Sequence, residues 1–300
     1  MPRRATKKTS LSIRFFVDQC IKINILKLPL LALAFFLLCQ SLPTHSFEKS
    51  PSTFTIAMPF LFNAPPYLWR NHHGEMVGTT IDAYELIAQQ QGYQLNWQFY
   101  SPAQANTKLL QDYQADKIDI FLSSIPKVIP RQALQKIDTH LISVSIHAFT
   151  PSHSTLAELS IKSLPNYQGI VGPIVNFSLA DIENKHIVLT KLQPLLVTDN
   201  DSQAITEALE KNKADFSIGE RSILAIRFRE QELDQQYQIM EPALGTIPTI
   251  MHYRVGSGFE DYLQGFKQWS TLLNNNGRVL HIKEKNMRRY LSEAHHSRNL

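Results

Sequence analysis

The sequence predicts an α/β protein of two lobes, each a mixed, mainly parallel sheet flanked by helices, with the second lobe inserted in the first. Strand and helix patterns alternate from residue 54 to residue 122 and again from residue 164 to residue 229. Such alternation predicts parallel strands joined by right-handed crossovers. The 300 residues are 43% hydrophobic and 19% charged, which is an ordinary globular composition with enough chain for two cores.

Residues 1–46 have the layout of an export signal. They carry seven basic residues against one acid, then an apolar run from Leu28 to Cys39 and a short polar stretch with small residues. Because the apolar run is short for a membrane span, we expect cleavage near Ser46 and export to the periplasm, with an uncleaved anchor as the alternative. Both cysteines, Cys20 and Cys39, lie in this leader, so the rest of the chain has no disulfide, thiol nucleophile or cysteine metal ligand. The leader also accounts for the net positive charge, so the basic pI is no argument for a nucleic-acid partner.

The first half is expected to fold as alternating strands and helices. The segment 79–91 has apolar residues at helical spacing and is stopped by Gly92, whereas 93–100 alternates apolar and polar residues as a strand does. The run at 118–122 is short and mainly apolar, which is typical of a buried strand. The expected order is a strand at 54–58, the helix, the second strand, a helix at 102–113 and the strand at 118–122.

Beyond residue 141 the pattern indicates a crossing to a second lobe. Residues 141–149 alternate as a strand and lead into a Pro/Ser/His segment, after which strands and helices alternate again. An extended stretch at 246–253 can return to the first lobe, where amphipathic helices at 258–275 and 279–291 close the chain. The expected divisions are 53–147 and 248–291 for lobe 1, 148–247 for lobe 2, and 292–300 for a frayed tail.

The stretch from residue 117 to residue 131 is the first candidate for a binding site. An apolar strand runs into Ser123 and Ser124, and a loop bounded by prolines then leads to Arg131. Ligands of open α/β sheets sit beyond the carboxyl ends of strands, and the arginine fork of donors matches a carboxylate. These residues predict a loop that holds an anion; the alternative is an ordinary surface arginine.

The loop at 59–69 is the second candidate, because it is rich in aromatic residues and prolines. Phe62, Tyr67 and Trp69 supply flat apolar area on which a ligand can stack. The alternative is a rigid loop that caps the core. The adjacent His72 and His73 lack the spacing of metal ligands, so we expect no metal site and no cofactor.

These motifs together resemble a known family. Over about residues 53–291 the chain is similar to extracytoplasmic solute-binding proteins of family 3, the polar amino acid type, also called type II periplasmic binding proteins. The motifs that carry the resemblance are Ala64-Pro65-Pro66-Tyr67, Gly74 to Gly78, Ile81-Asp82, Lys117 to Arg131, Lys211 to Asp215 with Glu220, and Asn276-Gly277-Arg278.

The resemblance implies a ligand site in a cleft between the lobes. In this family the residue that matches Arg131 grips the ligand's α-carboxylate, with hydroxyls that Ser123 and Ser124 could supply. The N-terminus of the helix near Ser178 would add N–H donors to the same carboxylate. The residue that matches Glu220 takes the α-ammonium. The aromatic loop would stack on the ligand's side chain through Phe62 or Tyr67.

The resemblance also implies a function. A small polar solute, an amino acid or a related carboxylate, would be captured when the lobes close about hinges near 147–151 and 246–250. The implied partner is an ABC-type permease of the inner membrane, and we expect a monomer that is not an enzyme. Two alternatives stay open: a periplasmic cyclohexadienyl dehydratase with Glu220 as proton donor, and an orphan or sensory binding protein. A third, purely structural hypothesis is that Arg131 and Glu220 form an ion pair.

Overall fold

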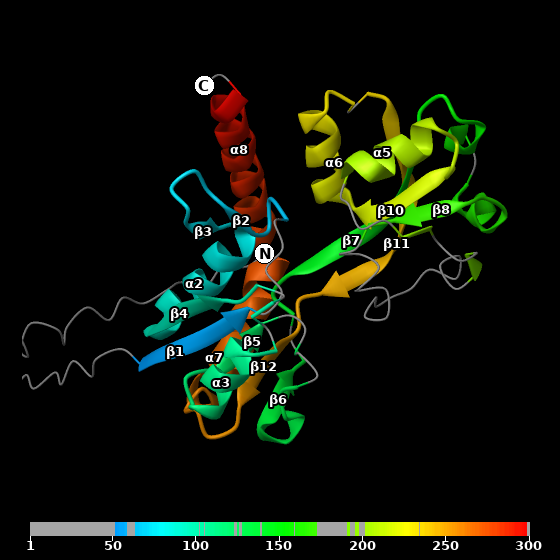
Figure 1. The fold of residues 1–300 in the computed structure, drawn as a ribbon. Coiled ribbons are helices and arrows are strands. Elements are labelled where there is room, and N and C mark those ends of the chain that lie inside the picture. The colour runs from blue at the N-terminus through cyan, green and yellow to red at the C-terminus, as the bar shows by residue number, and fades with distance from the viewer. Residues whose placement is uncertain are drawn as a thin grey trace, which may run out of the picture. The chain divides into compact units, whose positions relative to one another are not determined.

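The structure is a computed structural model in which residues 51–300 form one compact unit. It describes residues 52–58, 64–172, 191–192, 196–197 and 202–298, except for single positions at 102, 105, 123, 124, 126, 127, 139, 159 and 234. The predicted leader therefore lies outside the described residues. Two five-stranded sheets, each with its own helices, confirm the predicted two-lobed α/β fold (Figure 1).

The sheet of lobe 1 has the strand order β4-β1-β5-β12-β6. Strand β1 pairs in parallel with β4 and β5, whereas β12 runs antiparallel to β5 and to β6, so parallel and antiparallel pairs are equal in number. The strands are β1 (Ser52–Met58), β4 (Tyr93–Phe99), β5 (Ile120–Leu122), β6 (Leu134–Ile137) and β12 (Met251–Arg254).

Helices cover both faces of this sheet because its middle strands are apolar on both sides. Ile120, Phe121 and Leu122 of β5 are fully buried, with Ile120 and Leu122 on one face and Phe121 on the other. The first face packs against α2 (Thr79–Gln91), α7 (Glu260–Asn275) and α8 (Arg278–Arg298). The second packs against α3 (Lys108–Gln114) and against Ile125 and Ile129, which precede the short helix η1 (Arg131–Ala133).

The sheet of lobe 2 has the order β11-β7-β10-β8-β9 and is also mixed. Apolar residues of the short helices η2 and η3 pack on one face of it, and those of α5 and α6 pack on the other. The elements are β7 (Ser143–Pro151), η2 (Thr155–Glu158), η3 (Ile161–Asn166), β8 (Gly169–Val171), β9 (Leu196–Val197), α5 (Ser202–Glu210), β10 (Phe216–Glu220), α6 (Arg221–Glu230) and β11 (Tyr237–Pro248).

The chain crosses between the lobes earlier than the sequence predicts. Ser143 already pairs with Pro248 in the sheet of lobe 2, and the residues at 147–151 lie well inside that ladder. The crossings are therefore the segments 138–142 and 249–250, which the Thr249 N–H joins by donating to the Ile142 carbonyl at 2.8 Å. The alternating pattern at 141–149 continues across the crossing, so it could not mark the change of sheet.

The C-terminal segment also differs from the expected frayed tail at 292–300. Helix α8 continues to Arg298. It is held at this end because the indole N–H of the buried Trp69, in the small hairpin of β2 (Trp69–Arg70) and β3 (Met76–Val77), donates to Glu293 Oε2 at 3.1 Å. Among the described residues no helix is both long and apolar enough to cross a membrane.

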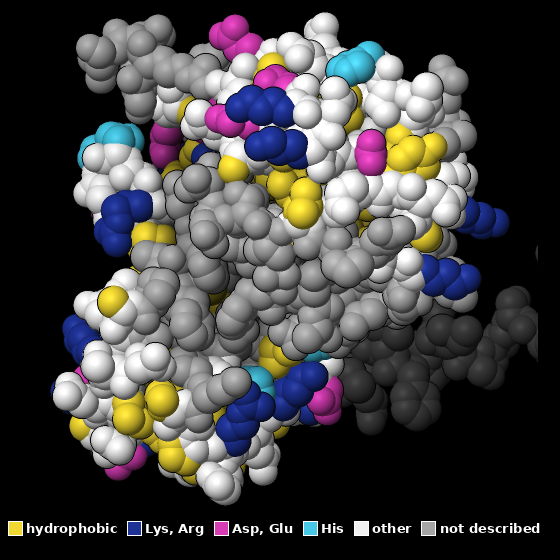
Figure 2. Space-filling view, turned by 45° about the vertical axis from the view of Figure 1, so that its right-hand side comes forward, with side chains coloured by type: hydrophobic (Ala, Val, Ile, Leu, Met, Phe, Trp, Pro, Cys, Tyr) yellow, Lys and Arg dark blue, Asp and Glu magenta, His cyan; other side chains and the backbone are white. Residues whose placement is uncertain are grey.

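Charges of both signs occur on the face of the molecule that Figure 2 shows. Figure 2 shows Lys and Arg side chains near Asp and Glu side chains on the face in view, with hydrophobic side chains exposed singly or in small groups between them.

Candidate functional site

Three of the seven predicted ligand-binding residues are described by the structure: Tyr67, Arg131 and Glu220. The other four, Phe62, Ser123, Ser124 and Ser178, lie outside the described residues. The structure brings Tyr67 and Glu220 into direct contact, although they belong to different lobes.

Tyr67 is held in place by the start of helix α2. It ends a tight turn after Ala64, and its carbonyl accepts the Thr80 N–H at 3.0 Å, while the Pro66 carbonyl accepts the Thr79 N–H at 3.0 Å. Gly78 allows this approach, because a Cβ at that position would lie 2.4 Å from the Tyr67 carbonyl oxygen and its φ is +139°. The Pro-Pro-Tyr turn and the glycine thus form one unit that fixes the Tyr67 ring.

Glu220 lies at the carboxyl end of β10, where the strand turns into helix α6. Its Oε2 accepts the Ile223 N–H at 2.7 Å, so the side chain caps the helix whose N-terminal dipole favours a negative charge. Only 3% of the residue is exposed. A carboxylate that is buried to this extent needs nearly all of its acceptor capacity to be satisfied.

The second oxygen of Glu220 contacts two residues of lobe 1, one of them on α8. The Tyr67 hydroxyl donates to Oε1 at 3.0 Å, and Lys283 Nζ lies 3.6 Å from the same atom. Lys283 also lies over the Tyr67 ring, 5.1 Å from its centroid, where a cation is attracted to the face of the ring. We call Tyr67, Glu220 and Lys283 the interlobe triad.

Burial raises the pKa of Tyr67 well above its usual value, and the negative charge of Glu220 and their hydrogen bond raise it further. The phenol therefore stays protonated at every working pH and acts as a permanent donor to the carboxylate. The interlobe triad combines one anion, one cation and one neutral donor, so its formal charges balance.

Arg131 makes no hydrogen bond or ion pair with the described members of this triad. It begins η1, is exposed, and forms no ion pair with any carboxylate that the structure describes. Its charge acts on His252 of β12, whose pKa falls to about 4 because of burial first and then Arg131 and Lys136. The cation that pairs with Glu220 is thus Lys283, and the hypothesis of an Arg131–Glu220 ion pair is wrong.

Helix α8 makes a second contact with lobe 2 two turns beyond Lys283. The Tyr290 hydroxyl donates to Glu230 Oε1 of α6, and the Tyr290 ring meets the Trp69 ring edge to face at 5.5 Å. Sequence reasoning missed Lys283 and Tyr290. Their spacing of seven residues puts them on one face of a helix, but nothing in the sequence indicates that this face meets the other lobe.

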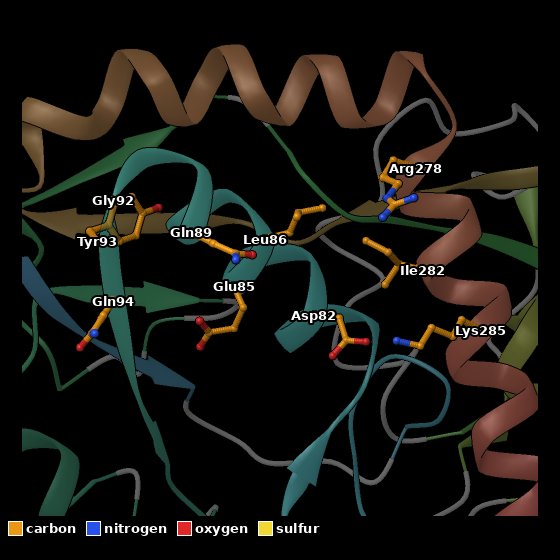
Figure 3. A pocket seen from close by; sticks show the side chains of 10 residues that line it. All are labelled: Asp82, Glu85, Leu86, Gln89, Gly92, Tyr93, Gln94, Arg278, Ile282 and Lys285. Carbon is orange, nitrogen blue, oxygen red and sulfur yellow. The ribbon is translucent and has the colours of Figure 1, made fainter. Parts of the chain in front are cut away.

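A separate cavity of about 650 Å³ lies within lobe 1 between α2 and α8. Figure 3 shows the carboxylates of Asp82 and Glu85 on one side and Arg278 and Lys285 on the other. Asp82 Oδ2 accepts a hydrogen bond from Asn286 at 2.9 Å. None of the predicted ligand-binding residues lines this cavity, and the described residues contain no group of His, Cys, Asp and Glu that could hold a metal ion.

Comparison with solved structures identifies the fold. The ligand-binding core of GluR0 in complex with L-glutamate is similar with a TM-score of 0.55 and 14% identity, covering 79% of this chain and 99% of that one. The second substrate-binding domain of a putative amino acid ABC transporter from Streptococcus pneumoniae gives 0.54 and 14%, covering 78% and 99%. Substrate-binding domain 2 of GlnP from Lactococcus lactis, in an open conformation, gives 0.54 and 16%, covering 78% and 95%.

The chain therefore has the two-lobed type II periplasmic binding fold that the sequence motifs predict. At these identities the likeness establishes the architecture of the chain. No protein-family model and no curated protein matches the sequence.

Proposed function

We propose that this protein is an exported binding protein that captures a small polar solute, an amino acid or a related carboxylate, between its two lobes. The leader at 1–46 directs it to the periplasm, and the loaded form delivers the solute to an ABC-type permease. The proposal agrees with the solved structures of the same fold, which include a complex with L-glutamate and a domain of a putative amino acid ABC transporter.

The observation that carries the proposal is the contact of Tyr67 with Glu220. A carboxylate that is 3% exposed stands at the carboxyl end of a strand in one lobe and is met by a buried tyrosine of the other. Ligands of α/β sheets bind beyond the carboxyl ends of the strands. Buried polar groups at this place are expected of a site that closes around a polar molecule.

Closure is proposed to occur at the two crossings, 138–142 and 249–250. Each sheet is held by its own ladder, so a change of angle between the lobes falls on the few residues that belong to neither sheet. A ligand that touches both lobes binds the closed form more tightly than the open form. This difference in affinity shifts the equilibrium towards the closed form.

The surroundings of Glu220 support binding over the dehydratase alternative. Both of its oxygens accept contacts from described donors: Oε1 from Tyr67 and Lys283, and Oε2 from Ile223. A general acid must present a protonated oxygen to the substrate. Both oxygens of Glu220 instead face donors of the chain itself.

A thermal-shift screen tests the proposal. Residues 51–300, the unit that is compact by itself, are heated with common amino acids, dicarboxylates, short peptides and prephenate-like acids. A ligand that binds only the folded state raises the melting temperature. At a concentration of a hundred times its dissociation constant it adds about 2.7 kcal/mol to the free energy of unfolding. We expect one compound class to give a clear rise.

Arg131→Ala is the matching variant, because Arg131 is the exposed cation to which the family resemblance assigns the ligand carboxylate. The variant should abolish the shift while leaving the unliganded melting temperature unchanged, and Lys136→Ala, which removes a nearby exposed charge, should keep the shift. The absence of a shift with every compound in the panel, or a shift that survives in Arg131→Ala, would contradict the assignment.

A further inference from the structure

The position of Lys283 bears on which class of ligand the site accepts. Its ammonium nitrogen lies 3.6 Å from Glu220 Oε1 and 5.1 Å from the centre of the Tyr67 ring. These are the positions at which a carboxylate and an aromatic face attract a cation. The chain thus places an ammonium group of its own against the buried acid.

Lys283 is held at this position by the packing of its helix. One residue before it, Ile282 is 7% exposed and belongs to the lobe 1 core, and three residues after it the 1% exposed Asn286 donates to Asp82 Oδ2 at 2.9 Å. The side chain of Lys283 itself is only 25% exposed, and among the described residues Glu220 is its only ion-pair partner. Lys283 is therefore a built-in part of the site rather than a freely moving surface lysine.

Donors of the chain itself already meet both oxygens of Glu220. Its two oxygens receive the Tyr67 hydroxyl, the Lys283 ammonium and the Ile223 N–H, and the residue is 3% exposed. A second ammonium brought to the same carboxylate would lie beside Lys283 and be repelled by it, because like charges at close range inside a protein are poorly screened.

Arg131, the predicted partner of the ligand's carboxylate, has no ion-pair partner among the described residues. Arg131 is exposed and pairs with no carboxylate that the structure describes. The negative charge of Glu220 is thus balanced by Lys283 of the same chain. The positive charge of Arg131 is left for the ligand. A carboxylate without an amino group matches this balance, and a zwitterion does not.

We infer that Lys283 takes the place of a ligand ammonium at Glu220, so that the protein selects carboxylic acids that lack an α-amino group over the corresponding amino acids. The inference rests on the proposed function and names the substrate class of the same site. Lys283 is then the residue that determines specificity at the acid.

Calorimetric titration with matched pairs tests this selection. Residues 51–300 are titrated with L-glutamate and glutarate, L-alanine and propionate, and L-phenylalanine and 3-phenylpropionate. Because each pair differs only in the amino group, the ratio of affinities within a pair reports on that group alone. In at least one pair we expect the acid to bind the unaltered protein about ten-fold or more tightly than the amino acid.

Lys283→Met tests the role of the lysine itself. It removes the internal cation but keeps an unbranched side chain, so the amino acid of that pair should gain about ten-fold or more relative to the acid. Lys285→Met, two residues further along the same helix and exposed, is the matched control and should keep the original preference. The comparison on the unaltered protein does not depend on whether Lys283→Met folds.

The outcomes separate the two claims. Tighter binding of the amino acid by the unaltered protein would overturn the inference and leave the proposed function standing. An unchanged preference in a folded Lys283→Met would have the same two consequences. Failure of every compound to bind any of the proteins would overturn the proposed function itself.

Discussion

Tyr67 and Glu220 show how a contact between two residues can link the lobes. The phenol is buried, its pKa is raised first by that burial, and its one donor is used on a carboxylate of the other lobe. Hydrogen bonds to charged groups are worth more than those between neutral groups, and a buried acceptor that loses its donor is costly.

Tyr67→Phe is therefore expected to lower the free energy of unfolding by about 2 kcal/mol. Tyr113→Phe is the matched control, because Tyr113 is similarly buried but its hydroxyl donates only to the neutral Pro130 carbonyl at a long 3.4 Å. Tyr113→Phe should lower the free energy of unfolding by about 1 kcal/mol or less. Urea unfolding of both variants measures the difference; equal losses would show that the Tyr67–Glu220 bond adds nothing.

His252 makes stability depend on pH. Its pKa is 6.5 in the unfolded chain and about 4 in the folded protein, where burial acts first and the charges of Arg131 and Lys136 add to it. Between these values the unfolded chain takes up a proton that the folded protein does not, so the free energy of unfolding falls as the pH falls from 6.5 towards 4.

His252→Gln removes this proton uptake. Between pH 7 and pH 5 the unaltered protein should lose about 1 kcal/mol more than the variant, a value reduced for the solvent that reaches the half-buried ring. Unfolding by urea at the two pH values gives both losses. If both proteins lose the same amount, His252 is not the group responsible.

At the scale of single elements, the sequence predicts those whose own residues fix them. Helix α2 has the predicted bounds because its apolar face and the Gly92 stop are both local signals. The sequence analysis missed strand β6 and residues 237–245 of β11, because their register comes from β12 and β7, which are distant in sequence. Local patterns cannot report a partner that only tertiary pairing supplies.

The C-terminal part of α8 is the clearest case of an element set by distant contacts. Its polar end reads as a frayed tail, yet Glu293 accepts the N–H of Trp69, which is 2% exposed. A hydrogen bond from another part of the chain thus extends the helix beyond the point at which its own sequence would end it.

A chain that stops after Leu291 should therefore melt about 4 °C lower than one that stops after Ala294, because it leaves the Trp69 N–H buried without its acceptor. The longer chain keeps Glu293 and serves as the control. Thermal denaturation of the two truncations decides the point, and identical melting temperatures would mean that the last turns do not hold the helix.

At the scale of the whole molecule, the two-lobed fold was predictable and the composition of the site was only partly so. The family resemblance assigned Tyr67 and Glu220 to one predicted site, and in the structure their side chains are hydrogen-bonded. Lys283 could not be predicted, because its role depends on α8 meeting α6, which no local spacing encodes. The first crossing was placed too late because the strand pattern continues through it.

The central claim, that the lobes close on a small carboxylate, is tested most directly by small-angle X-ray scattering of residues 51–300. The radius of gyration is measured alone and with a pooled mixture of the amino acids and carboxylic acids named above, at millimolar concentrations. Our account predicts a smaller radius with the mixture, because a ligand held by both lobes favours the closed form. An unchanged radius, whether or not the melting temperature rises, would contradict capture by closure.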